Sequence, residues 1–431
     1  MRNHTSFMLF LIFLLVSTMA FANGDQENNS GMSPDEVTLS FWTFQEIHYQ
    51  YFSKMVDRWN AEGHKPMIKI DGQVLPYGEM HDKLLVALQS GVGAPDMVDI
   101  EISRFPNYLK GKVQLLPFND MIDPVKDKLV IARYDNYAKD GMYYGLPFHV
   151  GASVMYYNKE LLDAAGVKVS DIVTWDDYFA AGRKVLSATG KPMTTFEVTE
   201  QWSFWQMISQ QGSDLFNADG TPSLDNPTNV KTLQFMLDMI NSGVAVPAPG
   251  GFHHSEEYYG FMNDAGAASV MMPMWYMGRF TDYMPDLNQK IIIAPLPRWT
   301  KDGNRSAGMG GTSTNVTAQS KYPDVAKQFL AFAKLSQEGN IAMWKDLGFD
   351  PPRWDVWEKP EMNEPNKFTA YFLNDNIFEM LVDIKDEVYP INVVEDLPEG
   401  ITLVRNALFQ VLEEQSKTPK EALSDVAKEL R

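Results

Sequence analysis

The chain has 431 residues, with 37 Lys plus Arg against 56 Asp plus Glu, and it contains no cysteine. This length predicts two or three domains, and the net charge of −19 disfavours nucleic acids and other polyanions as partners. The lack of cysteine excludes a disulfide framework, a thiolate metal site, a cysteine nucleophile and a cysteine-borne lipid anchor.

Residues 1–22 have the pattern of a secretory signal peptide. Arg2 precedes an apolar stretch that is too short to span a bilayer, and small residues with A-x-A spacing end at Ala22. We predict cleavage after Ala22, with an uncleaved signal anchor as the alternative. An exported protein without a lipid anchor needs an enclosing compartment, so a periplasmic location is expected. Residues 23–36 are polar and predict a disordered leader, with folding from Val37.

Strands and helices alternate over residues 37–101. The alternating segment VTLSFWTF predicts a strand, and the helix after it directs four residues inward: Phe52, Met55, Val56 and Trp59. A strand PMIKIDGQVL follows. The next helix, closed by Gly91, directs another four inward: Met80, Leu84, Leu85 and Leu88. A short strand PDMVDIE comes third. This alternation predicts βαβ units and a mostly parallel sheet covered on both faces.

The rest of the chain continues with capped helices and short strands. DGMYYGLPFHVGASVMYYN predicts a hairpin that runs into a long strand, after which Asn158 caps a helix. Thr174 and Asp177 have capping-box spacing. Residues 226–240 predict a helix with one apolar side: Leu233, Leu237 and Ile240. KIIIAPLPRW predicts a strand, DVAKQFLAFAKLSQEGNIAMWKDLG two helices, and the C-terminal segment two more.

The segment GAASVMMPMWYMGRF, residues 266–280, predicts a strand that gives way to a helix at Pro273. Trp275 and Tyr276 stand two and three residues after this proline. They are either core residues or a platform for a flat ligand, and the sequence has many aromatic residues for both purposes, with 10 Trp, 18 Tyr and 25 Phe.

Several familiar catalytic motifs are absent. The chain has no GxGxxG, P-loop, HExxH or G-x-S-x-G sequence. DLFNADGTPSLDN lacks the first and last ligands of a calcium loop. His253 and His254 are expected in an exposed, solvated loop. We therefore predict neither a metal nor a cofactor.

Aromatic and polar residues follow three successive strands. Trp42, Gln45, Tyr77, Asp99 and Glu101 all stand at or just after a predicted strand end. Open α/β sheets bind ligands at the carboxyl ends of their strands. The two acids have three interpretations: the paired carboxylates of a glycoside hydrolase, acceptors for ligand hydroxyls, or solvated surface acids.

The ordered set of segments resembles the extracellular solute-binding proteins of ABC importers, in the sugar-binding branch that includes maltose-binding protein. The resemblance covers about Val37 to Arg431 and is most specific in YGLPFHVGASVMYYNKELLDAAGV followed by TWDDYFAAGRKV. It also includes LSFWTF, YGEMHDKLLVALQSGVGAPDMVDIE, GAASVMMPMWYMGRF and IIIAPLPRWTKDGNRSAGMGGTST. The lipobox cysteine common in Gram-positive members is absent, and the stretch 354–366 does not align.

The resemblance implies an α/β fold, the two-lobed periplasmic-binding-protein fold, with hinge crossings and a ligand cleft between the lobes. The implied lobes are 37–148 plus 316–360, and 150–310 plus 365–431. The implied crossings lie near 149–152, near 311–316 and within 355–370. The small residues of HVGAS and GGTST suit hinges, because hinge positions absorb changes of φ and ψ.

By the same resemblance, nine residues are expected to bind ligand: Trp42, Gln45, Tyr77, Asp99, Glu101, Trp275, Tyr276, Gly311 and Thr312. Five form a second tier: Trp202, Trp205, Arg279, Trp344 and Arg353. Trp275 or Tyr276 would stack on a sugar ring.

The function implied is that of a periplasmic substrate-binding component of an ABC transporter, which captures a neutral mono- or oligosaccharide without chemistry and delivers it to a membrane permease. A monomer is expected. The alternatives are a binding protein for a non-sugar solute such as a polyamine, and a periplasmic glycoside hydrolase.

Overall fold

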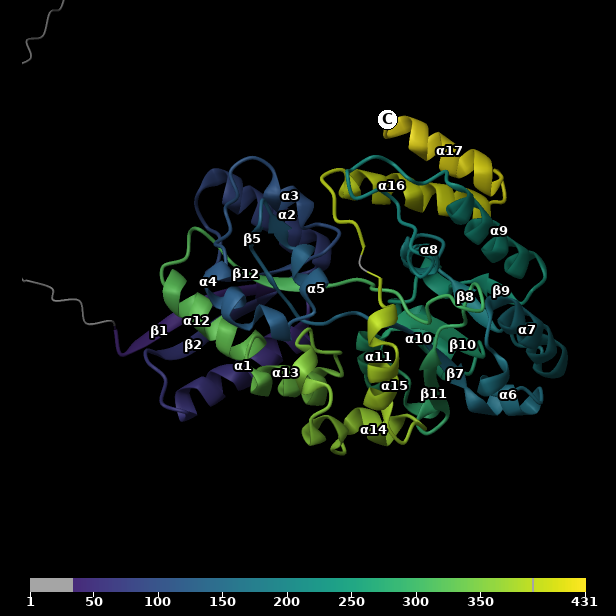
Figure 1. Cartoon of the computed structure of the whole chain (residues 1–431), viewed down its shortest axis with the longest axis horizontal. Helices are drawn as coiled ribbons and strands as arrows, with labels where there is room; N and C mark the ends of the chain where they lie inside the picture. Colours follow the sequence, from purple (N-terminus) through teal and green to yellow (C-terminus); the bar gives the residue numbers. More distant parts are fainter. Residues whose placement is uncertain (1–33, 390) are drawn as a thin grey trace, which may run out of the picture.

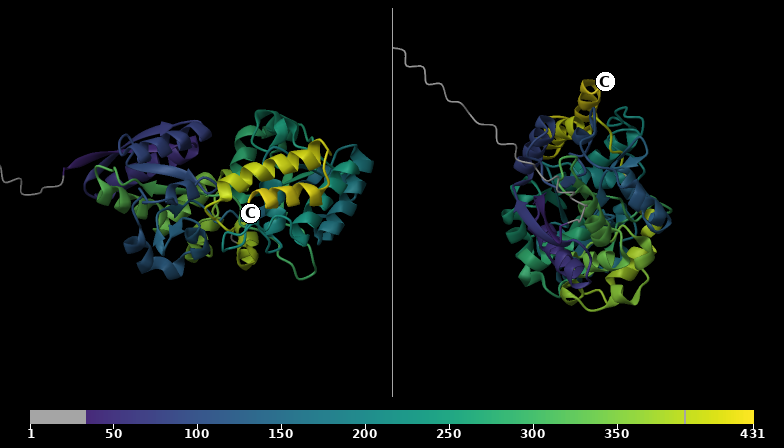
Figure 2. Two further views of the ribbon diagram at one scale, coloured as in Figure 1. Left: turned by 90° about the horizontal axis from the view of Figure 1, so that it is seen from above. Right: turned by 90° about the vertical axis from the view of Figure 1, so that its left-hand side faces the viewer.

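The computed structural model describes residues 34–389 and 391–431. The predicted signal peptide and the leader up to residue 33 lie outside the described residues. Two lobes lie side by side, and the chain runs between them (Figures 1 and 2). The α/β fold with two lobes is the architecture that the sequence predicts.

The first lobe is built on a five-stranded sheet with the order β2-β1-β3-β12-β6. Strand β1 pairs in parallel with β2 and β3, but β12 is antiparallel to β3, and β6 is antiparallel to β12. The parallel prediction is therefore correct for the first three strands and wrong for the other two, because β12 enters this sheet from the second lobe. The strands span Glu36–Thr43 (β1), Met67–Val74 (β2), Met97–Glu101 (β3), Leu146–Pro147 (β6) and Thr312–Val316 (β12).

Helices α1 and α2 follow β1 and β2, as predicted. The four inward residues of α1 are all buried. On α2, Met80, Leu84 and Leu88 are buried, whereas Leu85 is half-buried because it stands at the edge of the apolar stripe. The helices of this lobe are α1 (Glu46–Ala61), α2 (Tyr77–Ser90), α3 (Pro106–Leu109), α4 (Asn119–Ile122), α5 (Ile131–Asp135), α12 (Pro323–Lys334) and α13 (Gln337–Ala342).

The second lobe has a three-stranded sheet with the order β10-β7-β11, in which β7 is antiparallel to both neighbours. A short parallel pair, β8 and β9, lies beside it. The segment predicted as a hairpin and a long strand, residues 140–158, contains β5, β6 and β7 instead. Strand β5 pairs with β4, which lies just before this segment, β6 joins the first-lobe sheet, and β7 has six residues. These strands span Ala138–Lys139 (β4), Met142–Tyr143 (β5), Ser153–Asn158 (β7), Thr194–Phe196 (β8), Ala245–Pro247 (β9), Ser269–Pro273 (β10) and Ile291–Pro295 (β11).

The predicted helix caps of the second lobe are confirmed. Asn158 accepts a hydrogen bond from the Leu161 amide, and Thr174 with Asp177 forms a capping box at α7. Asn226 caps α9 in the same way. The helices span Lys159–Ala164 (α6), Trp175–Thr189 (α7), Trp202–Ser209 (α8), Pro227–Asn241 (α9), Glu256–Asn263 (α10), Met277–Tyr283 (α11), Lys367–Tyr371 (α14), Ile377–Asp383 (α15), Leu397–Leu408 (α16) and Pro419–Glu429 (α17).

The C-terminal helices α16 and α17 run along the second lobe, in yellow in Figure 2. On α9, which α17 contacts, Leu233 is buried as predicted, but Leu237 and Ile240 are only half-buried. The buried stripe of α9 passes through Met236 and Met239 instead. In the part of the chain that the structure describes, none of the helices combines the length and the apolar character needed to cross a membrane.

Three segments of chain meet where the lobes join. The first, residues 148–152, connects β6 to β7, and the second ends where β12 begins, so the crossing predicted at 311–316 falls mainly within a strand. The third contains Asp350. Its two carboxylate oxygens accept hydrogen bonds from the amides of Gly151 and Ala152 at 3.1 and 2.7 Å. Asp350 therefore ties the third segment to the first.

Asp350 should make stability depend on pH. Burial raises the pKa of this carboxyl to about 6, although the two amide donors act against the rise. An aspartate in the unfolded chain titrates near ~3.9. Between these values the folded state binds the proton more tightly, so this group lowers the free energy of unfolding as pH rises from about 4 to 6.

The check is urea unfolding of the wild type and of Asp350→Asn between pH 4 and 7. The variant is expected to be less stable at every pH, since an amide N–H then faces one of the backbone donors. Its stability should nevertheless change less across this interval. A wild-type-minus-variant difference that stays constant with pH contradicts the assignment.

Candidate functional site

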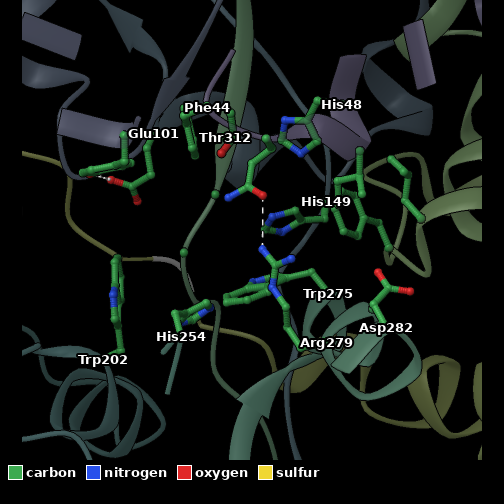
Figure 3. A pocket seen from close by; sticks show the side chains of 18 of the residues that line it. Phe44, His48, Glu101, His149, Trp202, His254, Trp275, Arg279, Asp282 and Thr312 are labelled. Carbon is green, nitrogen blue, oxygen red and sulfur yellow. Dashed lines mark hydrogen bonds between the residues drawn. The ribbon is translucent and has the colours of Figure 1, made fainter. Parts of the chain in front are cut away.

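A cavity of about 380 Å³ lies between the two lobes. This volume is within the ~300–1,000 Å³ range of small-molecule sites. Figure 3 shows its two walls, with Phe44, His48, Glu101 and Thr312 on one side and Trp202, Trp275 and Arg279 on the other. The cavity is therefore a cleft to which each lobe contributes one wall.

The first-lobe wall forms at the carboxyl ends of β1, β2 and β3, where open sheets place their ligand sites. Gln45 directly precedes α1, Tyr77 begins α2 and Glu101 ends β3. The Oε2 atom of Glu101 accepts hydrogen bonds from the Tyr77 hydroxyl and the Ser103 amide, both at 2.9 Å. Burial raises the pKa of Glu101. Its Oε1 is buried and has no hydrogen-bond partner among the described residues.

Trp202 provides a flat surface on the second-lobe wall. Its ring stacks on Trp205, with a centroid distance of 5.7 Å and an interplanar angle of 13°. Trp205 is buried, and its Nε1 donates a hydrogen bond to Asp214 at 2.6 Å. The rear face of Trp202 is therefore covered and held, and the ring borders the cavity as a rigid platform.

Trp275 and Tyr276 have different environments. The strand β10 does give way to helix after Pro273, through a short 3₁₀ turn at Met274–Tyr276. Trp275 lines the cavity, with ring centroids 5.3 Å from His254 and 6.3 Å from His149. Tyr276 is fully buried, and its hydroxyl donates to the carbonyl of His253. Of the pair, only Trp275 faces the cleft.

One hydrogen bond crosses the cleft directly. Arg279 of α11 donates from Nη2 to the side-chain oxygen of Gln45 at 3.1 Å, drawn as a dashed line in Figure 3. These two residues belong to opposite lobes. A ligand that enters between them must extend or replace this bond.

The end of the cleft near Trp202 is charged. Glu200 forms an ion pair with Arg405 of α16, and Arg405 also donates to Gln201 at 2.8 Å. Burial raises the pKa of Glu200, while Arg405 opposes the rise. Glu101 and Glu200 thus bring carboxylates from both lobes to one cavity. Each is engaged by neighbouring donors, as suits groups that accept hydrogen bonds from ligand hydroxyls.

Three of the six histidines that the structure describes within residues 34–431 line the cavity: His48, His149 and His254. Burial lowers the pKa of each, and that of His254 reaches about 3. At neutral pH they therefore contribute uncharged rings. The predicted solvated pair is wrong, because His253 is buried with its Nε2 2.9 Å from Thr195 Oγ1. Within the described residues, no group of three or more His, Asp or Glu side chains is arranged to hold a metal.

Eight of the fourteen residues expected at the site line the cavity: Gln45, Tyr77, Glu101, Trp275, Gly311, Thr312, Trp202 and Arg279. Six do not: Trp42, Asp99, Tyr276, Trp205, Trp344 and Arg353.

Two of these six belong to the interior of the first lobe. Trp42 is only 6% exposed and lies in the core, with the Lys83 ammonium 4.1 Å from its ring centroid. Asp99 is completely buried beneath the cleft wall, and both its oxygens accept hydrogen bonds from neighbouring side chains. Neither side chain is open to a ligand.

Three other residues that were expected at the site make interactions elsewhere in the protein. Trp344 is buried, and its Nε1 donates to the Met362 carbonyl at 2.8 Å. Arg353 is held by Asp355, with Nε–Oδ1 and Nη2–Oδ2 distances of 2.7 and 2.9 Å. Trp205, described above, acts behind Trp202. These interactions explain why large side chains with polar groups lie away from the cleft.

Sequence reasoning missed many lining residues. Phe44 directly precedes the expected residue Gln45, and Glu200 stands two residues before the expected residue Trp202, so both could have been included as sequence neighbours. Gly278 and Gly310 likewise adjoin the expected residues Arg279 and Gly311. The remaining lining residues were not marked by any motif, and the fold brings them to the cleft: Ile47, His48, His149, Phe252, His254, Asp282, Asp346, Leu347, Phe349, Lys367 and Arg405.

Comparison with known proteins gives consistent matches. Residues 45–339 match the family model described as bacterial extracellular solute-binding protein. The arabinooligosaccharide-binding protein of Bacillus subtilis (strain 168) is 52% identical over 98% of each chain. The arabinooligosaccharide-binding protein of Halalkalibacterium halodurans is 51% identical over 89% of this chain and 87% of that protein.

Solved structures agree on the fold. The maltose-bound MalE3 of T. maritima superposes with a TM-score of 0.75 at 19% identity, and the match covers 91% of this chain and 98% of that one. At this identity the likeness concerns the arrangement of the two lobes alone.

Proposed function

Because the chain belongs to the family of bacterial extracellular solute-binding proteins, we propose that its cleft captures an arabino-oligosaccharide and delivers it to the membrane subunits of an ABC importer. Two relatives more than half identical to the chain carry the name arabinooligosaccharide-binding protein, which supports this ligand class. The sugar ligand and the permease partner are those that the sequence resemblance implies.

The observation that carries the proposal is the pairing of two tryptophan faces with oxygen acceptors. Trp202 and Trp275 border the cavity from the second lobe, while Gln45 and Glu101 face it from the first. A sugar ring has apolar C–H faces and a rim of hydroxyl groups. The rings desolvate the faces, and the carboxylate and amide oxygens accept hydrogen bonds from the rim.

Capture needs no covalent chemistry. The ligand contacts both lobes, so it stabilises the closed arrangement by the difference between its affinities for the closed and open forms. Closure then presents the loaded protein to the permease. We assign no catalytic residue, and a 4-nitrophenyl arabinofuranoside is expected to release no nitrophenol.

Calorimetry and thermal shift on the chain from residue 23 test the proposal. Arabinotriose at a free concentration of 100 times its Kd should add about 2.7 kcal/mol to the free energy of unfolding. Maltotriose, xylotriose and spermidine serve as the comparison set. Stabilisation by spermidine and by none of the sugars refutes a carbohydrate ligand, and turnover of the aryl glycoside refutes capture without chemistry.

We further propose that the protein is exported, to the periplasm as the sequence predicts, with cleavage after Ala22. Membership of an extracellular family supports this location. N-terminal sequencing of the protein recovered from the periplasmic fraction should begin at Asn23. Recovery of intact Met1 in the membrane fraction supports the uncleaved anchor instead.

A further inference from the structure

A buried polar cluster lies directly beneath the first-lobe wall of the cleft. At its centre is Asp99, whose side chain is fully buried. Its Oδ2 lies 2.6 Å from Thr43 Oγ1 and 2.8 Å from His48 Nδ1, and its Oδ1 lies 2.6 Å from Thr314 Oγ1. Lys334, also fully buried, places Nζ 2.9 Å from Thr314 Oγ1. We refer to these five residues as the Asp99 cluster.

The directions of the hydrogen bonds in this cluster are fixed by its ends. The Lys334 amino group donates to Thr314, so the Thr314 hydroxyl points its own hydrogen at Asp99. The Gln45 amide donates to Thr43 at 3.1 Å, so the Thr43 hydroxyl also points at Asp99. The carboxylate is therefore surrounded by donors. The third donor is Nδ1–H of His48, which leaves the proton on that nitrogen.

The ring of His48 is held as well as hydrogen-bonded. It stacks on Phe148 with a centroid distance of 3.9 Å and an interplanar angle of 19°, and Phe349 meets it edge-on. The same Phe148 ring has the Lys334 nitrogen 3.3 Å from its centroid. The His48 ring and the Lys334 nitrogen are both too close to the Phe148 ring to lie on the same face of it. The Phe148 ring therefore separates the imidazole from the ammonium group. Its π face suits the charged form of Lys334.

The cluster thus contains one carboxylate and two bases, and Lys334 is placed to supply the balancing charge. Burial lowers the pKa of Lys334 well below its usual range, and Asp99 opposes this. The Thr314 oxygen and the Phe148 face favour the charged form.

Burial also lowers the pKa of His48, with Lys334 and Arg279 acting in the same direction and Asp99 against it. His149, which also lines the cavity, is itself kept neutral by burial, which lowers its pKa, with Arg133, His48 and Lys334 acting in the same direction. His48 is therefore neutral with Nδ1 protonated.

His48 lines the cavity, and within the described residues its Nε2 makes no hydrogen bond. We propose that His48 is a specificity-determining residue of the cleft, whose bare Nε2 accepts a hydrogen bond from a ligand hydroxyl, and that Asp99 is the positioning residue that fixes this tautomer. The inference rests on the proposed sugar ligand. It adds that the ligand group facing His48 Nε2 must be a hydrogen-bond donor. A ligand that has a carboxylate or a carbonyl there, or that lacks the hydroxyl, should bind more weakly.

The first test reads the imidazole itself. Nitrogen-15 spectra of the histidine-labelled protein at pH 7.5, with His48→Gln for assignment, should show Nδ1 protonated and Nε2 bare in the absence of ligand. Saturating arabinotriose should move the Nε2 resonance toward the hydrogen-bonded position. An Nε2–H tautomer, an imidazolium, or an Nε2 resonance that is unchanged in the complex overturns the inference.

Two variants change the tautomer or the charge without touching the cavity surface. Asp99→Asn can offer an N–H to Nδ1 of His48. This moves the imidazole proton to Nε2 and turns Nε2 from an acceptor into a donor, so arabinotriose should bind about tenfold more weakly.

Lys334→Met removes the balancing charge, so His48 should become protonated on acidification. The affinity for arabinotriose should then fall between pH 8 and 6, whereas the affinity of the wild type stays constant over this range. Unchanged affinity in Asp99→Asn with the tautomer moved, or identical pH profiles, contradicts the proposal.

Asp96→Asn is the matched control. Asp96 is another buried carboxylate of the same lobe, accepting hydrogen bonds from Ser40 and Ser320 away from the cleft. It should lose stability without losing affinity. The ligand-free tautomer separates this inference from the proposed function: a bare Nε2 without arabinotriose binding refutes the ligand alone, and the titration is then read with whichever sugar of the comparison set binds.

Discussion

Replacing Trp275 by alanine is expected to weaken the binding of arabinotriose by about 2 to 3 kcal/mol, roughly 30- to 150-fold in Kd. The ring lines the cleft and packs beside His254 and His149, so it is a rigid aromatic anchor of the kind that dominates binding energy. Isothermal titration at 25 °C on the wild type and the variant measures the difference directly.

Trp354→Ala is the control for this experiment. Trp354 is 45% exposed, lies outside the cleft and bonds only the Asp127 carbonyl through its Nε1. Its loss should leave Kd within twofold. A Trp275→Ala variant that binds as tightly as the Trp354→Ala variant refutes the stacking role.

The second large effect is expected at Gly151, in the first segment between the lobes. Its φ of 76° lies in the left-handed region, and a Cβ added there would overlap the carbonyl oxygen of Met309. That carbonyl belongs to the backbone of a second segment, whose amide donates to the Gly151 carbonyl at 2.8 Å, so neither partner can move aside. Gly151→Ala should therefore lower the free energy of unfolding by at least about 3 kcal/mol, from backbone strain plus overlap.

Gly91 offers a matched control for this substitution. It has the same φ of 76° at the end of α2, but nothing lies within 4 Å of an added Cβ. Gly91→Ala should cost only the conformational penalty, about 1 to 2 kcal/mol. Urea unfolding of both variants isolates the overlap. Equal losses show that the junction between the lobes tolerates a side chain at residue 151.

Local sequence signals predicted the elements well because their causes are local. The capping box at Thr174 and Asp177, the Asn158 cap and the apolar spacing of α1 each depend on residues within one or two helical turns. The antiparallel entry of β12 beside β3 depends on a residue more than 200 positions away, so no local pattern contains it. The sheet was therefore predicted correctly only for its first three strands along the chain.

The site divides in the same way. Strand ends placed Gln45, Tyr77 and Glu101 at the cleft, since the exit of a strand is visible in the sequence. Asp99, two residues before Glu101 on the same strand, is deeper and fully buried, and no pattern in MVDIE separates the two. Arg405 reaches the cleft from α16 through tertiary packing alone. Residue type identifies what can bind a sugar, but depth within the fold decides which of these residues does.

The pairing of β12 with β3 also has a consequence for how the molecule is made. Thr314 and Asp99 bond across this pair although 215 positions separate them along the chain, so the five-stranded sheet cannot close until nearly three quarters of the polypeptide has been synthesised. Bringing β3 and β12 together closes a loop of about 200 residues, and this loss of conformational entropy precedes the favourable contacts of the pair. Topologies of this kind fold slowly. Slow folding of the first lobe is compatible with the predicted export signal. A polypeptide whose first lobe is still unfolded can pass through a translocation channel.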